Sequence, residues 1–268
     1  KIKKKKLLIT IYDDDQDSLL IWKKITGFKD DKIIRLGTGD NFWSVGETGP
    51  CGPCTEIFYD YGDKFDGSIL KKGISGDRFV EVWNLVFMEF DQISKSKRTK
   101  LPKPCVDTGM GLERLAMAIK GLKSTYDIDL FDSIIKSLSK ESNYKYGENS
   151  KIDIAFRVIV DHIRAIVFTI SDGEIPSNNK SGYVIRRILR RAVRYGFSSL
   201  NIKKPFLHKL AKTVISEYGD IFDNLINQQN FIVKVILEEE KTFLKTLDKG
   251  LSMISNIKNK AINENKKI

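Results

Sequence analysis

Two hydrophobic patterns divide the chain. In the first part, β-branched and aromatic residues form short apolar runs at 7–12, 55–61 and 78–90, which is typical of buried strands. From residue 112 onward, apolar residues recur every three or four positions, which predicts amphipathic helices. The expected helices cover 112–120, 128–138, 152–170, 182–195, 205–218 and a long segment from 223 past 251. The pattern predicts an α+β fold, with a sheet and flanking helices followed by an all-α part that contains no strand.

Glycine-rich and polar segments mark the ends of these elements. Ser18 is the expected N-cap of a short helix that contains Trp22, and Gly121 is the expected stop of the helix that begins after residue 111. The Gly- and Pro-rich stretch 46–54 predicts a shaped loop rather than a helix or strand. Polar residues at 139–150 place a domain boundary near residue 140, giving domains at 1–140 and 141–268.

The composition indicates a globular protein with an anionic partner. The 268 residues include 46 Lys and Arg against 35 Asp and Glu, a net charge of +11, and a 41% hydrophobic fraction that a disordered basic tail would lack. No apolar run approaches the roughly 18 residues of a membrane span, so no membrane partner is expected. Three cysteines without a signal-peptide pattern indicate a reducing compartment; we expect the cytoplasm, with an organellar form left open.

Two of the cysteines, Cys51 and Cys54, form a C-x-x-C pair within the glycine-rich segment. This segment is either an ordinary structural turn or a loop whose backbone approaches a ligand closely, and the spacing leaves both interpretations open. A zinc site would need a second pair of ligands, and only Cys105 remains. A redox motif should begin a helix, which Pro53 disfavours. We therefore expect no metal site, and in particular no zinc site.

An asparagine interrupts the apolar strand at 81–87. Strand alternation places Val82, Asn84 and Val86 on one face, and Trp83 with Leu85 and Phe87 on the other. An unpaired buried amide costs roughly 1–3 kcal/mol, so Asn84 needs a partner. Two interpretations follow: a core asparagine satisfied by nearby backbone, or a small site lined by two valines that binds a small polar ligand.

The segment 106–114 reads as a strand end, two glycines and a helix start. Backbone N–H groups at such a helix start can meet an anion, Asp107 offers a carboxylate to a cation, and Arg114 lies one turn into the helix, within reach of a phosphate. The plainer alternative is a strand-to-helix turn with a surface ion pair.

Five arginines follow one side of the helix expected at 182–195: Arg186, Arg187, Arg190, Arg191 and Arg194. No Asp or Glu lies between Lys180 and Leu200 to neutralise them. This favours contact with nucleic-acid phosphates over a solvated charged face, and it predicts salt-sensitive binding.

Four segments together carry a family resemblance: DNFWSVGETGPCGPCTEIFYD, EVWNLVF, VDTGMGLERL and FRVIVDHIRAIVFTISDGEIPSNNKSGYVIRRILRRAVRYG. The first three resemble the catalytic core of the alanyl-tRNA synthetase family, which belongs to the class II aminoacyl-tRNA synthetases, and the third is similar to motif 3 of that class. The fourth resembles the helical tRNA-recognition domain of the same family. The matches run in order over nearly the whole chain, and they imply that the sheet is part of the antiparallel sheet of a class II synthetase.

The resemblance implies roles for residues of both parts. ATP, as its Mg²⁺ complex, would lie against Trp43, Val82, Trp83, Asn84, Gly111 and Arg114, and alanine against Asn84, Val86, Asp107 and Gly109. Asp107, pairing with the substrate ammonium, and Arg114, meeting the γ-phosphate, would be the catalytic residues. Asn178 would read a G·U wobble pair in the acceptor stem of tRNA(Ala), beside the five arginines.

The implied reaction is ATP-dependent activation of alanine to alanyl-adenylate, followed by transfer to tRNA(Ala). Motifs 1 and 2 of the class are not recognisable before Leu7, so the chain is expected to be an interior piece that is inactive alone. The alternative is a non-catalytic basic tRNA-binding module or a degenerate paralogue.

Overall fold

The computed structural model describes residues 2–37, 39–70 and 73–263, and it divides into two compact units, 1–128 and 129–268. The division falls ahead of the predicted boundary near residue 140, because the helix at 129–142 packs with the helices that follow it. Strands are confined to the first unit in the described part of the chain, which confirms the predicted α+β class. No helix of that described part is long and apolar enough to cross a membrane.

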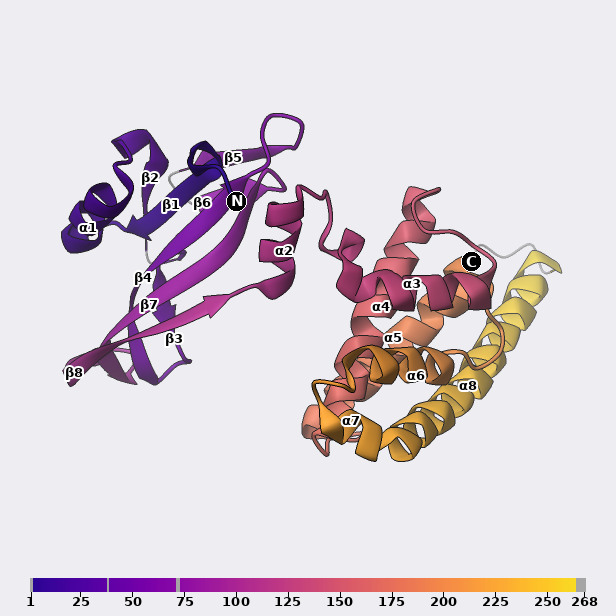
Figure 1. Ribbon diagram of the computed structural model, residues 1–268. Helices are drawn as coiled ribbons and strands as arrows, with labels where there is room; N and C mark the ends of the chain where they lie inside the picture. The colour runs from indigo at the N-terminus through magenta and orange to yellow at the C-terminus, as the bar shows by residue number, and fades with distance from the viewer. Residues whose placement is uncertain (1, 38, 71–72, 264–268) are drawn as a thin grey trace. The chain divides into compact units, whose positions relative to one another are not determined.

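The first unit is built on one mixed sheet with the strand order β2-β1-β4-β7-β8, in which β3 also pairs with β4 (Figure 1). Its strands are β1 (Leu7–Tyr12), β2 (Ile33–Leu36), β3 (Phe42–Ser44), β4 (Gly49–Asp60), β7 (Phe79–Ser94) and β8 (Lys97–Met110). An antiparallel sheet was expected. All strand pairs of this sheet are antiparallel except β1 with β2, which is parallel. Helix α1 (Gln16–Thr26) connects these two strands, and a helical crossover is what a parallel pair requires.

The loop predicted at 46–54 is confirmed at 46–48 and wrong for the rest, because β4 begins at Gly49 and runs through residues 49–54. The strand is irregular there, with a register shift between Cys51 and Cys54 against β7. A Cβ on Gly52 would lie 1.9 Å from the carbonyl oxygen of Phe87, so only glycine permits this strand approach. Here the glycines and prolines are features of a bulged strand.

Helix α1 covers one face of the sheet, where Ile9, Ile11 and Ile33 pack against Leu19. Its N-cap is Asp15 and not Ser18, since the Asp15 carboxylate accepts a hydrogen bond from the Ser18 backbone N–H (2.8 Å). The unit also contains an unpredicted hairpin, β5 (Gly67–Leu70) with β6 (Gly73–Gly76), and three short 3₁₀ turns, Lys4–Lys6, Asp30–Lys32 and Thr125–Asp127. After β8, α2 (Leu112–Lys120) ends at Gly121, as predicted; this glycine adopts a left-handed conformation with φ of 66°.

The second unit is helical: α3 (Asp129–Ser142), α4 (Ser150–Ser171), α5 (Lys180–Ser199), α6 (Leu207–Tyr218), α7 (Asp223–Asn227) and α8 (Gln229–Asn263). The long helix expected from 223 is interrupted at Gln228, so α7 is separate from α8. Within this unit α8 packs against α5 and α6 (Figure 1). The fully buried Glu240 of α8 caps α6, accepting hydrogen bonds from the backbone N–H groups of Phe206 (2.8 Å) and Leu207 (3.1 Å).

Candidate functional site

The sheet face opposite α1 carries a row of polar residues at matching register positions. Thr10 of β1 pairs with Glu56 of β4, Glu56 with Asn84 of β7, and Asn84 with Gly109 of β8. Because paired residues of neighbouring strands project to the same face, these four positions form one line across the sheet. The predicted Asn84 site is therefore built by four strands.

Glu56 is the centre of this row. It accepts hydrogen bonds from Thr10 Oγ1 (3.1 Å) and Asn84 Nδ2 (3.3 Å), and Asn41 Nδ2 in turn donates to Thr10 Oγ1 (2.9 Å). Burial, and secondarily the negative charge of Glu81, raises the pKa of Glu56 to about 7. Its protonation thus changes near neutral pH.

The contact with Glu56 fixes the orientation of the Asn84 amide. An ionised carboxylate only accepts hydrogen bonds, so the nitrogen of Asn84 faces Glu56 when Glu56 is ionised. Asn84 Oδ1 has no hydrogen-bond partner among the described residues, and Val82 and Val86 on either side of Asn84 are buried. The arrangement leaves a buried acceptor oxygen unpaired beside two valine side chains, and an amino group of a small ligand is a donor that would satisfy it.

Asp107 and Gly109 border this position on β8. Asp107 pairs with Val86 and is exposed. Its carboxylate accepts one hydrogen bond, from the Thr108 backbone N–H (2.8 Å). A Cβ on Gly109 would meet nothing within 4 Å, so the surface beside Asn84 is open there. The structure therefore brings together Asn84, Val86, Asp107 and Gly109, the four residues implied to bind alanine.

Arg114 of α2 approaches the same face. Its Nη1 donates to the backbone carbonyl oxygen of Glu81 (3.1 Å) and forms an ion pair with Glu81 Oε2 (3.2 Å), while the side chain remains half exposed. Gly111, which is hydrogen-bonded from its N–H to the Val82 carbonyl (3.1 Å), precedes α2 and leaves room for the Arg114 side chain. This exposed guanidinium could exchange its carboxylate partner for a phosphate.

The two tryptophans implied to bind ATP lie elsewhere. Trp83 projects from β7 to the face opposite Asn84, where its indole N–H donates to Thr108 Oγ1. Trp43 lies on β3 opposite Gly52, which precedes Glu56, the residue of β4 in the row. The structure thus groups Val82, Asn84, Gly111 and Arg114 but does not bring either tryptophan to them.

The C-x-x-C cysteines lie inside β4, and Cys54, which pairs with Val86, projects to the same face as Glu56 and Asn84. Cys51 and Cys54 are buried free thiols, and burial, followed by the charge of Glu56, raises the pKa of Cys54 to about 12. Such a thiol is protonated and unreactive at neutral pH. No group of three or more His, Cys, Asp or Glu side chains within residues 2–37, 39–70 and 73–263 is placed to bind a metal ion.

The arginine helix of the second unit divides into two sets. Arg187, Arg191 and Arg194 of α5 are exposed, whereas Arg186 and Arg190 are partly buried against Glu239 of α8. All five line an open groove of about 780 Å³, together with Asn178, Tyr183 and other residues of α5 and α8. These five arginines, the arginine stripe, therefore do have an acidic neighbour: Glu239, which belongs to α8 and lies far from α5 in the sequence.

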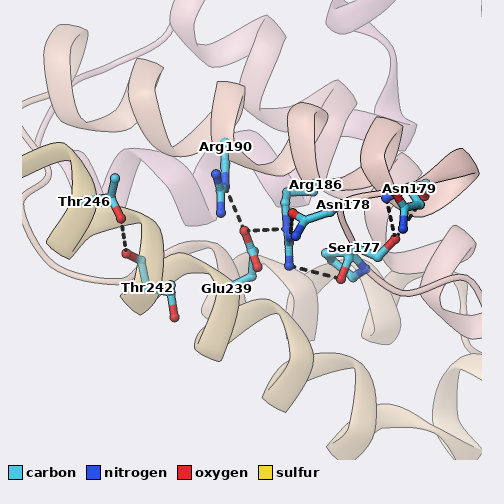
Figure 2. Close-up of polar contacts among 9 residues, drawn as sticks. Ser177, Asn178, Asn179, Arg186, Arg190, Glu239, Thr242 and Thr246 are labelled. Carbon is cyan, nitrogen blue, oxygen red and sulfur yellow. Dashed lines mark hydrogen bonds and ion pairs between the residues drawn. The ribbon is translucent and has the colours of Figure 1, made fainter.

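Asn178 lies at the start of this groove, in the segment before α5 (Figure 2). Arg186 Nη1 donates to Asn178 Oδ1, and Arg186 Nη2 donates to the Pro176 carbonyl (3.4 Å). A Cβ on Gly182 would lie 2.3 Å from Ser177 Oγ, so glycine lets this segment pack closely on α5. The structure thus places Asn178 beside Arg186, in the groove that the five arginines line.

Sequence reasoning missed three acidic residues of these sites: Glu56, Glu81 and Glu239. Glu56 carried a detectable signal, since it is one of two carboxylates, with Asp60, within the run 55–61 that is typical of a buried strand. Glu239 carried none, because it sits in the run Glu238–Glu239–Glu240, which resembles a solvated helix surface.

Comparison with known proteins identifies the family. The family model described as tRNA synthetases class II (A) matches residues 1–268. The chain is 47% identical over 251 residues to the alanine–tRNA ligase of Hyphomonas neptunium, covering 93% of this chain and 28% of that protein. It is 45% identical over 253 residues to the alanine–tRNA ligase of Rickettsia felis, covering 94% and 28%. The chain thus spans about a quarter of the length of these relatives, and it belongs to the class II (A) family of tRNA synthetases.

Proposed function

We propose that the chain is a segment of an alanine–tRNA ligase, which forms alanyl-adenylate and pyrophosphate from alanine and MgATP and then transfers alanine to tRNA(Ala). The observation that carries this proposal is the Asn84 position, where an acceptor oxygen between two valines lies beside the Asp107 carboxylate. The names of the two relatives support the choice of alanine and its tRNA.

In this proposal Asp107 pairs with the ammonium group of alanine, and Asn84 Oδ1 accepts a second hydrogen bond from it. Val82 and Val86 are buried apolar side chains that suit contact with the methyl group of alanine. The alanine carboxylate then attacks the α-phosphorus of ATP, forming the acyl–phosphate bond as the bond to pyrophosphate breaks. The protein contributes orientation and charge stabilisation to this step rather than a nucleophile.

Arg114 is proposed to bind the γ-phosphate of ATP. Its present partners are the Glu81 carbonyl and carboxylate, at a half-exposed position where a triphosphate competes well for a guanidinium. The Mg²⁺ enters with ATP as part of the substrate.

The helical unit is proposed to bind the acceptor stem of tRNA(Ala). Arg187, Arg191 and Arg194 are exposed along one groove and suit phosphate contacts, while Asn178 beside them suits a base edge. Phosphate contacts predict binding that weakens with salt.

Asp107→Ala tests the proposal in the enzyme that contains this segment. We expect alanine-dependent exchange of pyrophosphate into ATP to fall by at least about a thousandfold, because the ammonium loses its charged partner. The control is Cys105→Ala, a change at an exposed position of the same strand, which should exchange normally. Near-normal exchange by Asp107→Ala would refute the proposed alanine site. If the unaltered protein bound tRNA but showed no exchange, a non-catalytic tRNA-binding module would be favoured.

A further inference from the structure

We propose that Glu239 is a positioning residue for RNA recognition: it fixes Arg186, which holds the Asn178 amide with its nitrogen turned toward the groove. The inference rests on the proposed function, since it requires that the groove of α5 binds the tRNA acceptor stem. It goes further by assigning a role to a carboxylate that the sequence did not single out.

The first step is the contact between Glu239 and the arginines. Glu239 Oε1 accepts a hydrogen bond from Arg190 Nε (2.8 Å) and forms an ion pair with Arg186 Nε (3.1 Å), so a single oxygen holds two guanidinium groups (Figure 2). The side chain of Glu239 is only 10% exposed. A partly buried carboxylate shared by two arginines is held more firmly than an exposed surface pair.

The second step is the contact between Arg186 and Asn178. Because a guanidinium has only donors, the Asn178 atom that faces Arg186 must be its oxygen. The second terminal nitrogen of Arg186 donates to the Pro176 carbonyl, so this one side chain is tied to two points of the segment that carries Asn178. Asn178 Nδ2 forms no hydrogen bond with the described residues and is the group left to meet a base.

Glu239 also reduces the positive charge of the arginines on α5. A helix that only attracted phosphates would bind RNA more strongly without a carboxylate in the middle of its arginines. Glu239 neutralises part of the stripe and leaves Arg187, Arg191 and Arg194 exposed for phosphate contact. The carboxylate therefore lowers general affinity while it fixes geometry, as expected of a group that serves specificity.

The test uses the 268-residue chain and two RNA hairpins that copy the acceptor stem of tRNA(Ala), one with the G·U wobble pair and one with G·C at that position. Binding of each hairpin is measured over a range of salt concentrations. The variant is Glu239→Gln, which keeps the size of the side chain but removes its charge. The control is Glu238→Gln, with the same change of charge at the neighbouring exposed residue, which pairs with Lys241 (3.0 Å).

We expect Glu239→Gln to reduce the preference for the G·U hairpin by about fivefold or more, the range of one base-edge contact. Its affinity for both hairpins should rise at low salt and depend more steeply on salt, because two arginines are released. A variant that merely loosened the fold would bind both hairpins more weakly. Glu238→Gln should keep the preference of the unaltered chain.

If Glu239→Gln keeps the preference for G·U, the positioning role is overturned while the proposed function stands. If the unaltered chain shows no preference, both are overturned.

Should Glu239→Gln fail to fold, Arg186→Gln and Arg190→Gln provide the test. Each removes one positive charge and leaves Glu239 one arginine partner, but only Arg186 contacts Asn178. We expect Arg186→Gln to lose the preference and Arg190→Gln to weaken binding to both hairpins equally. An equal loss of preference in the two variants would contradict the inference.

Discussion

Two asparagines of this protein, Asn84 in the sheet unit and Asn178 in the helical unit, are held in opposite orientations. The amide N–H of Asn84 donates to the carboxylate of Glu56, and its buried oxygen has no hydrogen-bond partner among the described residues. Asn178 accepts from the guanidinium of Arg186 and leaves its nitrogen available. An available oxygen suits an ammonium donor, and an available nitrogen suits the acceptor atoms on a base edge. The partner of each asparagine thus decides which kind of ligand the same amide can recognise.

Glu240, the buried neighbour of Glu239, is expected to affect the stability of the fold and not the recognition of RNA. Burial raises the pKa of Glu240 to about 7 from an ordinary 4.5, so the folded protein takes up a proton that the unfolded chain does not. The free energy of unfolding should therefore fall as pH rises from about 4.5 to 7, by on the order of 3 kcal/mol, and remain low above 7.

Glu240→Gln should remove this slope, because the amide oxygen can still accept from Phe206 and Leu207 without titrating. The measurement is thermal unfolding of both proteins by circular dichroism from pH 4.5 to 8. The difference in unfolding free energy between the two proteins removes most contributions of other titrating groups. The contribution of His208 does not cancel fully, because its Nδ1 lies 3.6 Å from Glu240 Oε2. RNA preference should be unchanged; its loss would show that Glu240 shares the role assigned to Glu239.

A smaller effect is expected at the partner of Asn84. Because Glu56 has a pKa near 7, its negative charge, which attracts the ligand ammonium, is present above pH 7 and lost below it. Binding of a non-hydrolysable alanyl-adenylate analogue should weaken by up to about tenfold from pH 8 to pH 6.

Calorimetry with the unaltered protein and with Glu56→Gln checks this prediction. The variant should bind with nearly the same affinity at both pH values, and more weakly than the unaltered protein at pH 8. Equal pH dependence in the two proteins would show that the charge of Glu56 does not affect ligand binding, and it would contradict the role of Glu56 in orienting Asn84.

Local patterns predicted much of this architecture. Periodicity, which neighbouring residues determine, predicts the strand runs, the helix from 112 to Gly121, the helical second part and the shared face of Asn84 and Val86. The alternation is interrupted at Val82, where the pairing of β7 with β4 shifts register. The Gly- and Pro-rich segment was misassigned because its composition indicates a turn. Its conformation depends on how closely Gly52 approaches β7, which only the pairing of strands reveals.

The partners of the two asparagines were missed for a related reason. Glu56 meets Asn84 only because β4 pairs with β7 in one register, and Glu239 meets Arg190 across a separation of 49 residues. The arginine stripe was judged from its own stretch of sequence, where no acidic residue occurs. Tertiary packing supplied the carboxylate.

The orientation of Asn178 can be tested directly by NMR. The side-chain amide of Asn178, in a chain labelled at asparagine and assigned with Asn178→Asp, is followed as each of the two hairpins is added. We predict a larger shift of its nitrogen and protons with the G·U hairpin than with the G·C hairpin, and no response of the Asn84 amide to either. Equal shifts of Asn178 with both hairpins, or none with either, would contradict the claim that Asn178 presents its nitrogen to the RNA.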